Sequence, residues 1–214
     1  MPIIIDHQLR EHIPHNAIEF PITYYHDELV TLPDRTGPLH WHPDFEVASA
    51  ERGVLDYQVG EHHIILQAGD SIFVNGNMLH GIKQLSGDVP DPMPNIVFSG
   101  TLIAPETSAI YQKHILPIVQ CDSLPFVVFR HSDPSHSEIN CLIKEIYKQM
   151  NENNTCYELA VQRNINCIFE FISCNLNKLP KTEATRIQIN NQIRLQKMLT
   201  YIYENYAESV TLED

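Results

Sequence analysis

Short apolar runs separated by turn residues fill the first 131 positions of the chain. Most runs are rich in β-branched or aromatic residues, and Gly, Pro, Asp or Asn stands between most of them, which is typical of short strands. The predicted strands cover residues 17–25, 46–50, 53–60, 62–68, 70–75, 81–85, 95–103 and 126–129, and a proline-rich loop covers 86–95. Many short strands at this spacing indicate a sandwich or a barrel-like jelly roll.

After residue 131 the apolar spacing changes to the period of an α-helix. In 137–152 the apolar stripe consists of Ile139, Leu142, Ile143, Ile146, Tyr147 and Met150. In 155–178 it consists of Val161, Ile165, Ile168, Phe169, Ile172 and Leu176, and Cys167, Phe171 and Cys174 widen it. So broad an apolar face is expected to have more than one partner. The two helices fit either a dimerisation hairpin or a lid on the barrel, and the breadth of the face favours dimerisation.

The last part of the chain predicts a linker and then a further helix. Residues 177–190 are polar and contain Pro180, a helix breaker. The helical pattern resumes in 192–209, with Leu195, Met198, Leu199, Ile202 and Tyr206 on one face. Thr211 and Asp214 then form the pattern that caps the start of a helix. Since a domain is not expected to end there, the sequence predicts a piece of a longer protein.

Composition and charge exclude several classes of protein. The sequence has no apolar run of 18 residues and no signal peptide at its start, so we expect a cytoplasmic protein without membrane contact. Five cysteines without a CxxC pair indicate small buried side chains in a reducing compartment rather than disulfides or a zinc knuckle. A net charge of −13 argues against nucleic-acid binding by this material, although residues 175–200 carry a net +4, which leaves −17 elsewhere.

The stretch LHWHPDFE, residues 39–46, carries candidate chemistry. In an extended strand His40 and His42 point to the same face, and Glu46 lies at even spacing from both. His80 follows in GDSIFVNGNMLHG, and three imidazoles with one carboxylate suit a divalent ion such as Zn, Ni, Mn or Fe. The alternative is that these four side chains, with Tyr57, line a polar pocket that binds a small ligand without a metal. Trp41 is expected on the opposite face, in the core rather than as a platform for a sugar.

These motifs resemble the cupin superfamily. The first cupin motif is matched by His40, His42, Glu46 and Gly53, and the second by Gly69 and His80. The departures are Asn75 and Asn77, where proline and glycine would stand, and Gln84 in place of an asparagine. The candidate ligands therefore match, and the residues that shape the turn are partly replaced.

With its C-terminal part included, the chain resembles the AraC family of bacterial transcription regulators. QKMLTYIYENYAESVTLED, residues 196–214, is similar to the first helix and the start of the second in that family's helix-turn-helix domain. The resemblance implies a mainly β fold with C-terminal α: a cupin (double-stranded β-helix, jelly-roll) barrel, a helical hairpin and the start of a DNA-binding domain. The implied parts are an N-terminal arm at 1–16, a ligand-sensing barrel at 17–131, a dimerisation hairpin at 132–176, a linker at 177–190 and a truncated helix-turn-helix start at 191–214.

The function that this resemblance implies is effector-controlled transcription regulation without catalysis. A small molecule, for example a sugar, would bind at His40, His42, Glu46, Tyr57 and His80; no cofactor is required, although the four ligand residues suit a metal. The whole protein would be a homodimer that binds promoter DNA, whereas residues 1–214 alone are not expected to do so. The arm would be either a frayed terminus or, by analogy with the family, a cover over the ligand. The alternatives are a metal-dependent cupin enzyme and a dimeric carbohydrate-binding module.

Overall fold

A computed structural model describes residues 4–15, 17, 19–85, 92–182, 198 and 201. The helix-turn-helix start expected at 191–214 lies outside the described residues except for Met198 and Tyr201. Most of the linker expected at 177–190 and part of the loop expected at 86–95 also lie outside them.

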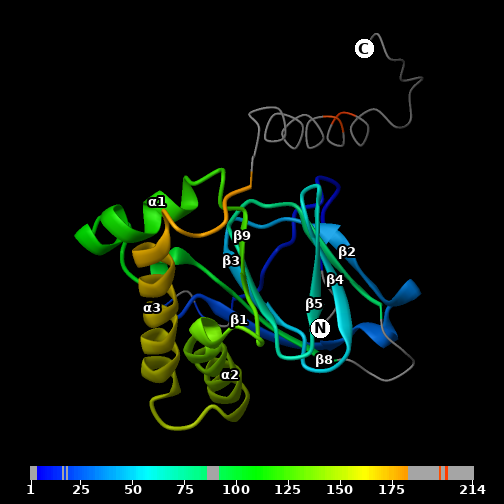
Figure 1. Ribbon diagram of the computed structural model, residues 1–214. Helices are drawn as coiled ribbons and strands as arrows, with labels where there is room; N and C mark the ends of the chain where they lie inside the picture. The colour runs from blue at the N-terminus through cyan, green and yellow to red at the C-terminus, as the bar shows by residue number, and fades with distance from the viewer. Residues whose placement is uncertain are drawn as a thin grey trace.

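Two antiparallel sheets face each other and form the barrel (Figure 1). The five-stranded sheet has the order β1-β8-β3-β6-β9 and the four-stranded sheet the order β2-β7-β4-β5. Their bounds are β1 Ile22–Glu28, β2 Thr36–His40, β3 Phe45–Ser49, β4 Val54–Val59, β5 His62–Gln67, β6 Ser71–Val74, β7 His80–Gln84, β8 Pro92–Phe98 and β9 Phe126–Phe129. The jelly roll expected from the apolar pattern is therefore confirmed, as is the mainly β barrel followed by helices that the family resemblance implied.

Several strand predictions need correction. β1 begins at Ile22, later than expected, and β2 at residues 36–40 was not predicted. Residues 92–95 belong to β8 rather than to a loop, since they pair with β1. β3 pairs with β8 only from Asn95 onward, so Pro92 and Pro94 have one neighbouring strand. Proline is tolerated in such a half-paired position, where its missing N–H breaks no ladder.

The region between β8 and β9 also differs from the prediction. The strand expected at 95–103 ends at Phe98, and residues 100–102 form a 3-10 turn. A helical segment that the apolar pattern did not reveal follows, with a π-helical turn at Tyr111–Ile115 and α1 at Leu116–Val119. Ile115 and Ile118 from this segment are buried in the core.

Two helices, α2 (Ser137–Glu152) and α3 (Tyr157–Asn175), cover the outer face of the five-stranded sheet (Figure 1). Their buried faces reproduce most of the predicted stripes, although Leu142 and Leu176 are only half-buried and Cys174 is exposed. None of the five cysteines is buried, so the prediction of buried cysteine side chains is wrong. Phe169 of α3 is 3% exposed, and its ring centroid lies 5.0–6.0 Å from those of Phe45, Phe73 and Phe98 on the sheet. The hairpin is therefore an integral part of the core, and dimerisation through it stays a prediction.

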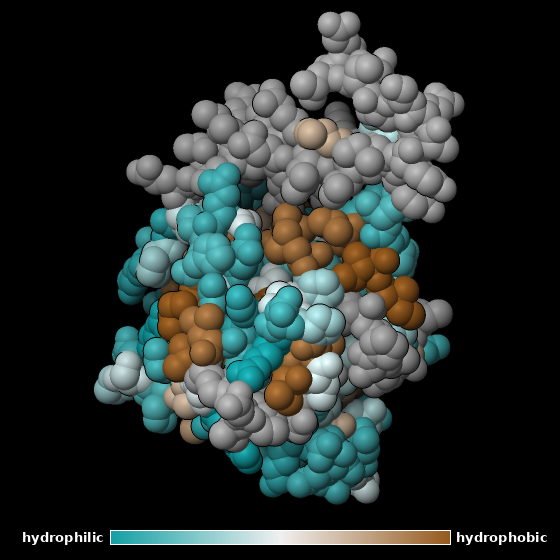
Figure 2. Space-filling view, turned by 90° about the vertical axis from the view of Figure 1, so that its right-hand side faces the viewer, coloured by the Kyte–Doolittle hydropathy of each residue, from teal (hydrophilic) through white to brown (hydrophobic). Residues whose placement is uncertain are grey.

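The barrel has two separate apolar layers, which decide where polar side chains can go. One lies between the five-stranded sheet and the helices, and the other between the two sheets. Along β3, Phe45 and Val47 face the helices, so period-two alternation turns Glu46 and Ala48 into the barrel. On β5 the inward side chains Ile64 and Leu66 alternate with exposed ones. On the molecular face to the right of the view in Figure 1, hydrophobic residues form separate groups among hydrophilic ones (Figure 2).

Asp70 fastens the turn before β6 to the end of β9. Its carboxylate accepts hydrogen bonds from the backbone N–H groups of Gln67 and His131 and from Nη1 of Arg130, at 2.7–3.0 Å. Although burial opposes the effect, these donors hold the pKa of Asp70 below its usual value. Among the described residues, no helix has the length and apolar character needed to span a bilayer.

Candidate functional site

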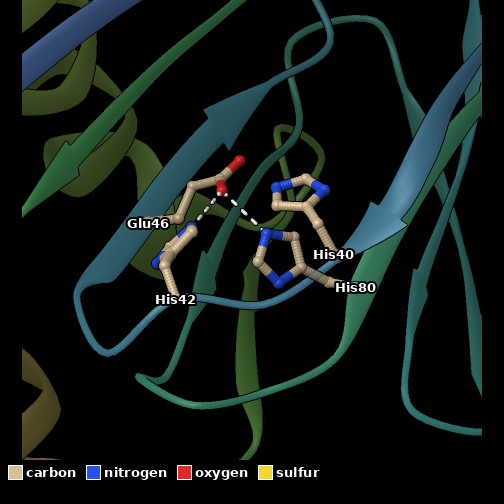
Figure 3. A group of neighbouring side chains, drawn as sticks. All are labelled: His40, His42, Glu46 and His80. Carbon is tan, nitrogen blue, oxygen red and sulfur yellow. Dashed lines mark hydrogen bonds and ion pairs between the residues drawn. The ribbon is translucent and has the colours of Figure 1, made fainter. Parts of the chain in front are cut away.

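Four polar side chains converge between the two sheets, beside the apolar layer of the barrel (Figure 3). They are His40, His42, Glu46 and His80, and each is at least nine-tenths buried. Their candidate ligand atoms all lie within 4.8 Å of one another. The structure thus brings together all four residues that the sequence singled out as a group.

These four residues come from different elements, although His40, His42 and Glu46 were expected on a single strand. His40 ends β2 and pairs directly with His80 at the start of β7, so the four-stranded sheet supplies two of the imidazoles. His42 lies in the connection to β3, where its carbonyl accepts a 2.7 Å hydrogen bond from the backbone N–H of Asn77. Glu46 comes from the opposite sheet. Cross-strand pairing and a turn, rather than alternation along one strand, therefore build the cluster.

The hydrogen bonds of the three imidazoles fix which ring nitrogen faces the cluster. Each Nδ1 lies against a backbone carbonyl, at 2.8 Å for His40 and Pro38, 3.0 Å for His42 and Asp44, and 2.7 Å for His80 and Met78. Because a carbonyl oxygen only accepts, each Nδ1 carries the proton and donates it. All three Nε2 atoms are then left pointing inward, which is the arrangement found around metal-binding histidines.

Glu46 is the centre of the cluster. Its Oε2 lies 3.3 Å from Nε2 of His42 and 3.0 Å from Nε2 of His80, and its Oε1 accepts a 2.7 Å hydrogen bond from the hydroxyl of Tyr57. Burial by itself would raise the pKa of Glu46, but the two histidines outweigh it and hold that pKa well below the usual range. Burial and the charge of Glu46 raise the pKa of Tyr57 well above 10, so Tyr57 stays a neutral donor.

The sequence did not identify a further polar residue of the site, Glu11, which comes from the N-terminal arm. Glu11 is 5% exposed, and its Oε2 lies 3.3 Å from Nε2 of His40. Nothing in the local pattern of the arm distinguishes Glu11 from the neighbouring polar residues. Only the tertiary structure shows that it enters the barrel.

Trp41 does not pack in the core, so that prediction is wrong. It is half-buried, and the arm lies against it, with the guanidinium of Arg10 5.5 Å from the indole centroid. The indole N–H donates a 2.9 Å hydrogen bond to the carbonyl of Gln8. The arm is therefore docked on Trp41 through residues 8–11, and the frayed-terminus interpretation is wrong for that stretch.

A small cavity adjoins the cluster. Its polar wall consists of Glu11, His40, Glu46, Tyr57, His80 and Asn95, and Leu29, Met93 and Val97 lie among the apolar residues that line it. Its volume is about 40 Å³, which admits an ion or a few water molecules, whereas sites for organic ligands measure about 300–1,000 Å³. With the arm in this position, the cavity is therefore much smaller than a typical site for a sugar.

Comparisons with known proteins agree with the fold and the site. The model of the cupin domain matches residues 28–90, which include the histidines and Glu46. The uncharacterized HTH-type transcriptional regulator YdeC of Bacillus subtilis (strain 168) is 23% identical over 216 residues, which span 99% of this chain and 70% of that protein. The structure of ToxT from Vibrio cholerae superposes with a TM-score of 0.50 at 12% identity, over 90% of this chain and 68% of that one, and shows the shared fold.

The jelly roll with its glutamate and histidines between the sheets first defines a class, that of proteins with a cupin domain. The likeness to the HTH-type regulator extends over nearly the whole chain, including the helices after the barrel. Together, these findings confirm the resemblance and support an AraC-like regulator with a cupin domain.

Proposed function

We propose that this chain is the effector-binding and dimerisation portion of an AraC-type DNA-binding transcription regulator. The effector binds inside the barrel, at His40, His42, Glu46, Tyr57 and His80. The observation that carries this proposal is a buried polar cluster in an apolar interior, where uncompensated polar groups are costly and ligand sites are typical. The likeness to a protein named as an HTH-type regulator supports regulation rather than catalysis.

Signal transfer uses the layered arrangement of the fold. Glu46 and the neighbours that face the helices alternate on β3, so a ligand that moves Glu46 also moves the surface on which α3 packs. In the proposed dimer, α2 and α3 carry this displacement toward DNA-binding elements of the whole protein. A ligand shifts such an equilibrium only by its differential affinity for the two states, typically about 1–3 kcal/mol.

A thermal-shift screen against a metabolite panel tests effector binding. A ligand present at 100 times its Kd stabilises the folded state by about 2.7 kcal/mol, which corresponds to a rise in Tm of roughly 5–10 °C for a chain of this size. The rise is expected for the native sequence and for Glu106→Gln, an exposed control, and is expected to disappear in Glu46→Gln. If every stabilising compound acts equally on Glu46→Gln, the effector does not bind at this site.

A metal-dependent cupin enzyme is the second candidate, and the three inward Nε2 atoms favour it. His40, His42, Glu46 and His80 would hold the ion, since all four donor types and their mutual distances suit a divalent transition metal. A bound ion would supply Lewis-acid chemistry. Turnover of a substrate that depends on stoichiometric metal would establish this alternative, whereas metal binding without turnover would favour the regulator.

A further inference from the structure

A groove outside the barrel lies between α3 and the π-helical turn that precedes α1 (Figure 1). Its volume is about 420 Å³, against about 40 Å³ for the cavity beside the histidine cluster. Sites for small organic molecules measure about 300–1,000 Å³, so the groove falls within that range and the cavity lies well below it. The five-stranded sheet separates the two, because α3 packs on one face of that sheet and Glu46 lies on the other.

The floor of the groove is apolar and firmly packed. It contains Ile115 and Phe169, which are 1% and 3% exposed. The ring of Phe169 is held from behind by the phenylalanines of the sheet, so its position is fixed. Ile103 and Ile110 extend the apolar surface toward the rim, where Ile110 is exposed. Such a surface favours the apolar body of a ligand, because contact between the two removes both from water.

The π-helical turn gives the groove one of its walls. The carbonyl of Tyr111 accepts a hydrogen bond from the N–H of Leu116, five residues later, and Pro117 lacks the N–H that an α-helical bond at this point would use. The hydroxyl of Ser173 on α3 donates a 3.3 Å hydrogen bond to the carbonyl of His114 and so ties the two walls together. Turns of this kind are rare and recur at functional sites.

The charge at the rim selects the kind of ligand. Among the described residues that line the groove there is no lysine or arginine, and Glu170 supplies the only carboxylate. Within the part of the chain that the structure describes, no ion pair or hydrogen bond engages that carboxylate. Asn166 lies one turn earlier on the same face of α3 and also lines the groove. A cationic group is therefore the complement of this rim, and the net charge of −13 favours its approach.

We propose that this groove is a second ligand site, which binds a small organic cation with an apolar body and one ammonium group. The apolar body lies on Ile115 and Phe169. The ammonium group donates hydrogen bonds to the carboxylate of Glu170 and to the side-chain carbonyl of Asn166. This site is distinct from the proposed effector site in the barrel and does not depend on it.

Three probes that share one hydrocarbon chain test the proposal: octylamine, octanol and octanoate, which are cationic, neutral and anionic at neutral pH. Isothermal titration calorimetry gives Kd for the native chain, for Glu170→Gln and for Glu158→Gln. Glu158 is the matched control, because it is an exposed carboxylate on the same helix and does not line the groove. Asn166→Phe, at an exposed position, places a ring in the groove and tests the apolar part of the site.

The cysteines report where the probe binds. Cys174 lines the groove, whereas the exposed Cys141 and Cys156 do not. Alkylation by iodoacetamide, followed for each cysteine by peptide mass spectrometry, is compared with and without octylamine. Octylamine should slow the alkylation of Cys174 and leave that of Cys141 and Cys156 unchanged.

We expect the native chain to bind octylamine more tightly than octanol, and octanol more tightly than octanoate. Glu170→Gln should weaken octylamine about threefold, as for an exposed ion pair, and leave octanol unchanged. Glu158→Gln should alter neither, and Asn166→Phe should weaken all three probes. Because Glu170 and Asn166 are both exposed, these variants are expected to fold.

Equal affinity for octylamine and octanoate would overturn the proposal, as would protection of all three cysteines or an absence of binding. Protection of Cys174 that grows with protein concentration in the absence of probe would show that a second copy of the chain covers the groove, and this too would overturn it. The effector site is tested separately, since Glu46→Gln should bind octylamine as the native chain does. A metabolite that stabilises the native chain but not Glu46→Gln would leave the effector site standing if the groove binds nothing.

Discussion

Removing the hydroxyl of Tyr57 isolates one contact of the cluster with little change in shape. Tyr57 is 2% exposed, and in Tyr57→Phe the Oε1 atom of Glu46 loses its 2.7 Å donor while the ring is retained. Hydrogen bonds to a charged acceptor contribute about 1.5–3 kcal/mol, against about 0.5–1.5 kcal/mol for neutral pairs. We therefore expect the free energy of unfolding to fall by about 2 kcal/mol.

Tyr147→Phe is the matched comparison. The hydroxyl of Tyr147 is also buried, but it bonds neutral partners, the carbonyl of Val47 at 3.1 Å and the hydroxyl of Ser49 at 3.0 Å. Its loss should cost about 1 kcal/mol. Urea unfolding of both variants at neutral pH, in the presence of a chelator, gives the two free energies directly.

A double-mutant cycle with Glu46→Gln separates the contact from other effects of the substitution. The coupling between Tyr57 and Glu46 should exceed about 1 kcal/mol, as expected for contacting residues. If Tyr57→Phe costs no more than Tyr147→Phe, or if the coupling is near zero, the hydroxyl does not support a charged Glu46 and the electrostatic description of the cluster is wrong.

Other predictions concern the parts that hold the site in place. Phe169→Ala should lower the free energy of unfolding by about 3–5 kcal/mol, whereas Leu159→Ala, at a side chain 68% exposed, should change it little; chemical denaturation checks both. Asp70→Asn should lower the free energy of unfolding by about 2 kcal/mol at neutral pH. Because the folded-state pKa of Asp70 is lowered, its contribution to stability is present above the unfolded pKa near 3.9 and fades as pH falls below that value. Unfolding curves measured between pH 7 and pH 3 would reveal this loss. Gly76→Ala would place a Cβ 2.3 Å from the carbonyl oxygen of Pro43. It should therefore displace the connection that holds His42 and weaken zinc binding more than it lowers Tm. An unchanged Kd for zinc, measured by titration, would contradict this.

The departures from the cupin turn motif acquire a reason only in the structure. Asn75 stands where proline is usual, and its side-chain amide donates to the carbonyls of Ile118 and Leu124 at 2.7 and 3.2 Å. It thereby ties the turn after β6 to the helical segment that the apolar pattern failed to predict. A proline there could not make these bonds, so the replaced residue has a structural role of its own.

The sequence by itself determined the mainly β class, the two helices and the four cluster residues. These are properties of local periodicity and of short motifs: alternation marks strands, the three-and-four spacing marks helices, and histidine with glutamate marks ligand chemistry. It placed His40, His42, Glu46 and His80 in one group, although the assumed single strand was wrong.

Tertiary structure alone decided what surrounds that group. The entry of Glu11, the docking of the arm on Trp41 and the small size of the cavity depend on contacts between residues more than 25 positions apart in the chain. Local pattern carries no information on such contacts, because their geometry is set by which sheets face each other and how the chain returns between them. The chemistry of the site could therefore be predicted from its residues, but the way the N-terminal arm closes the site could not.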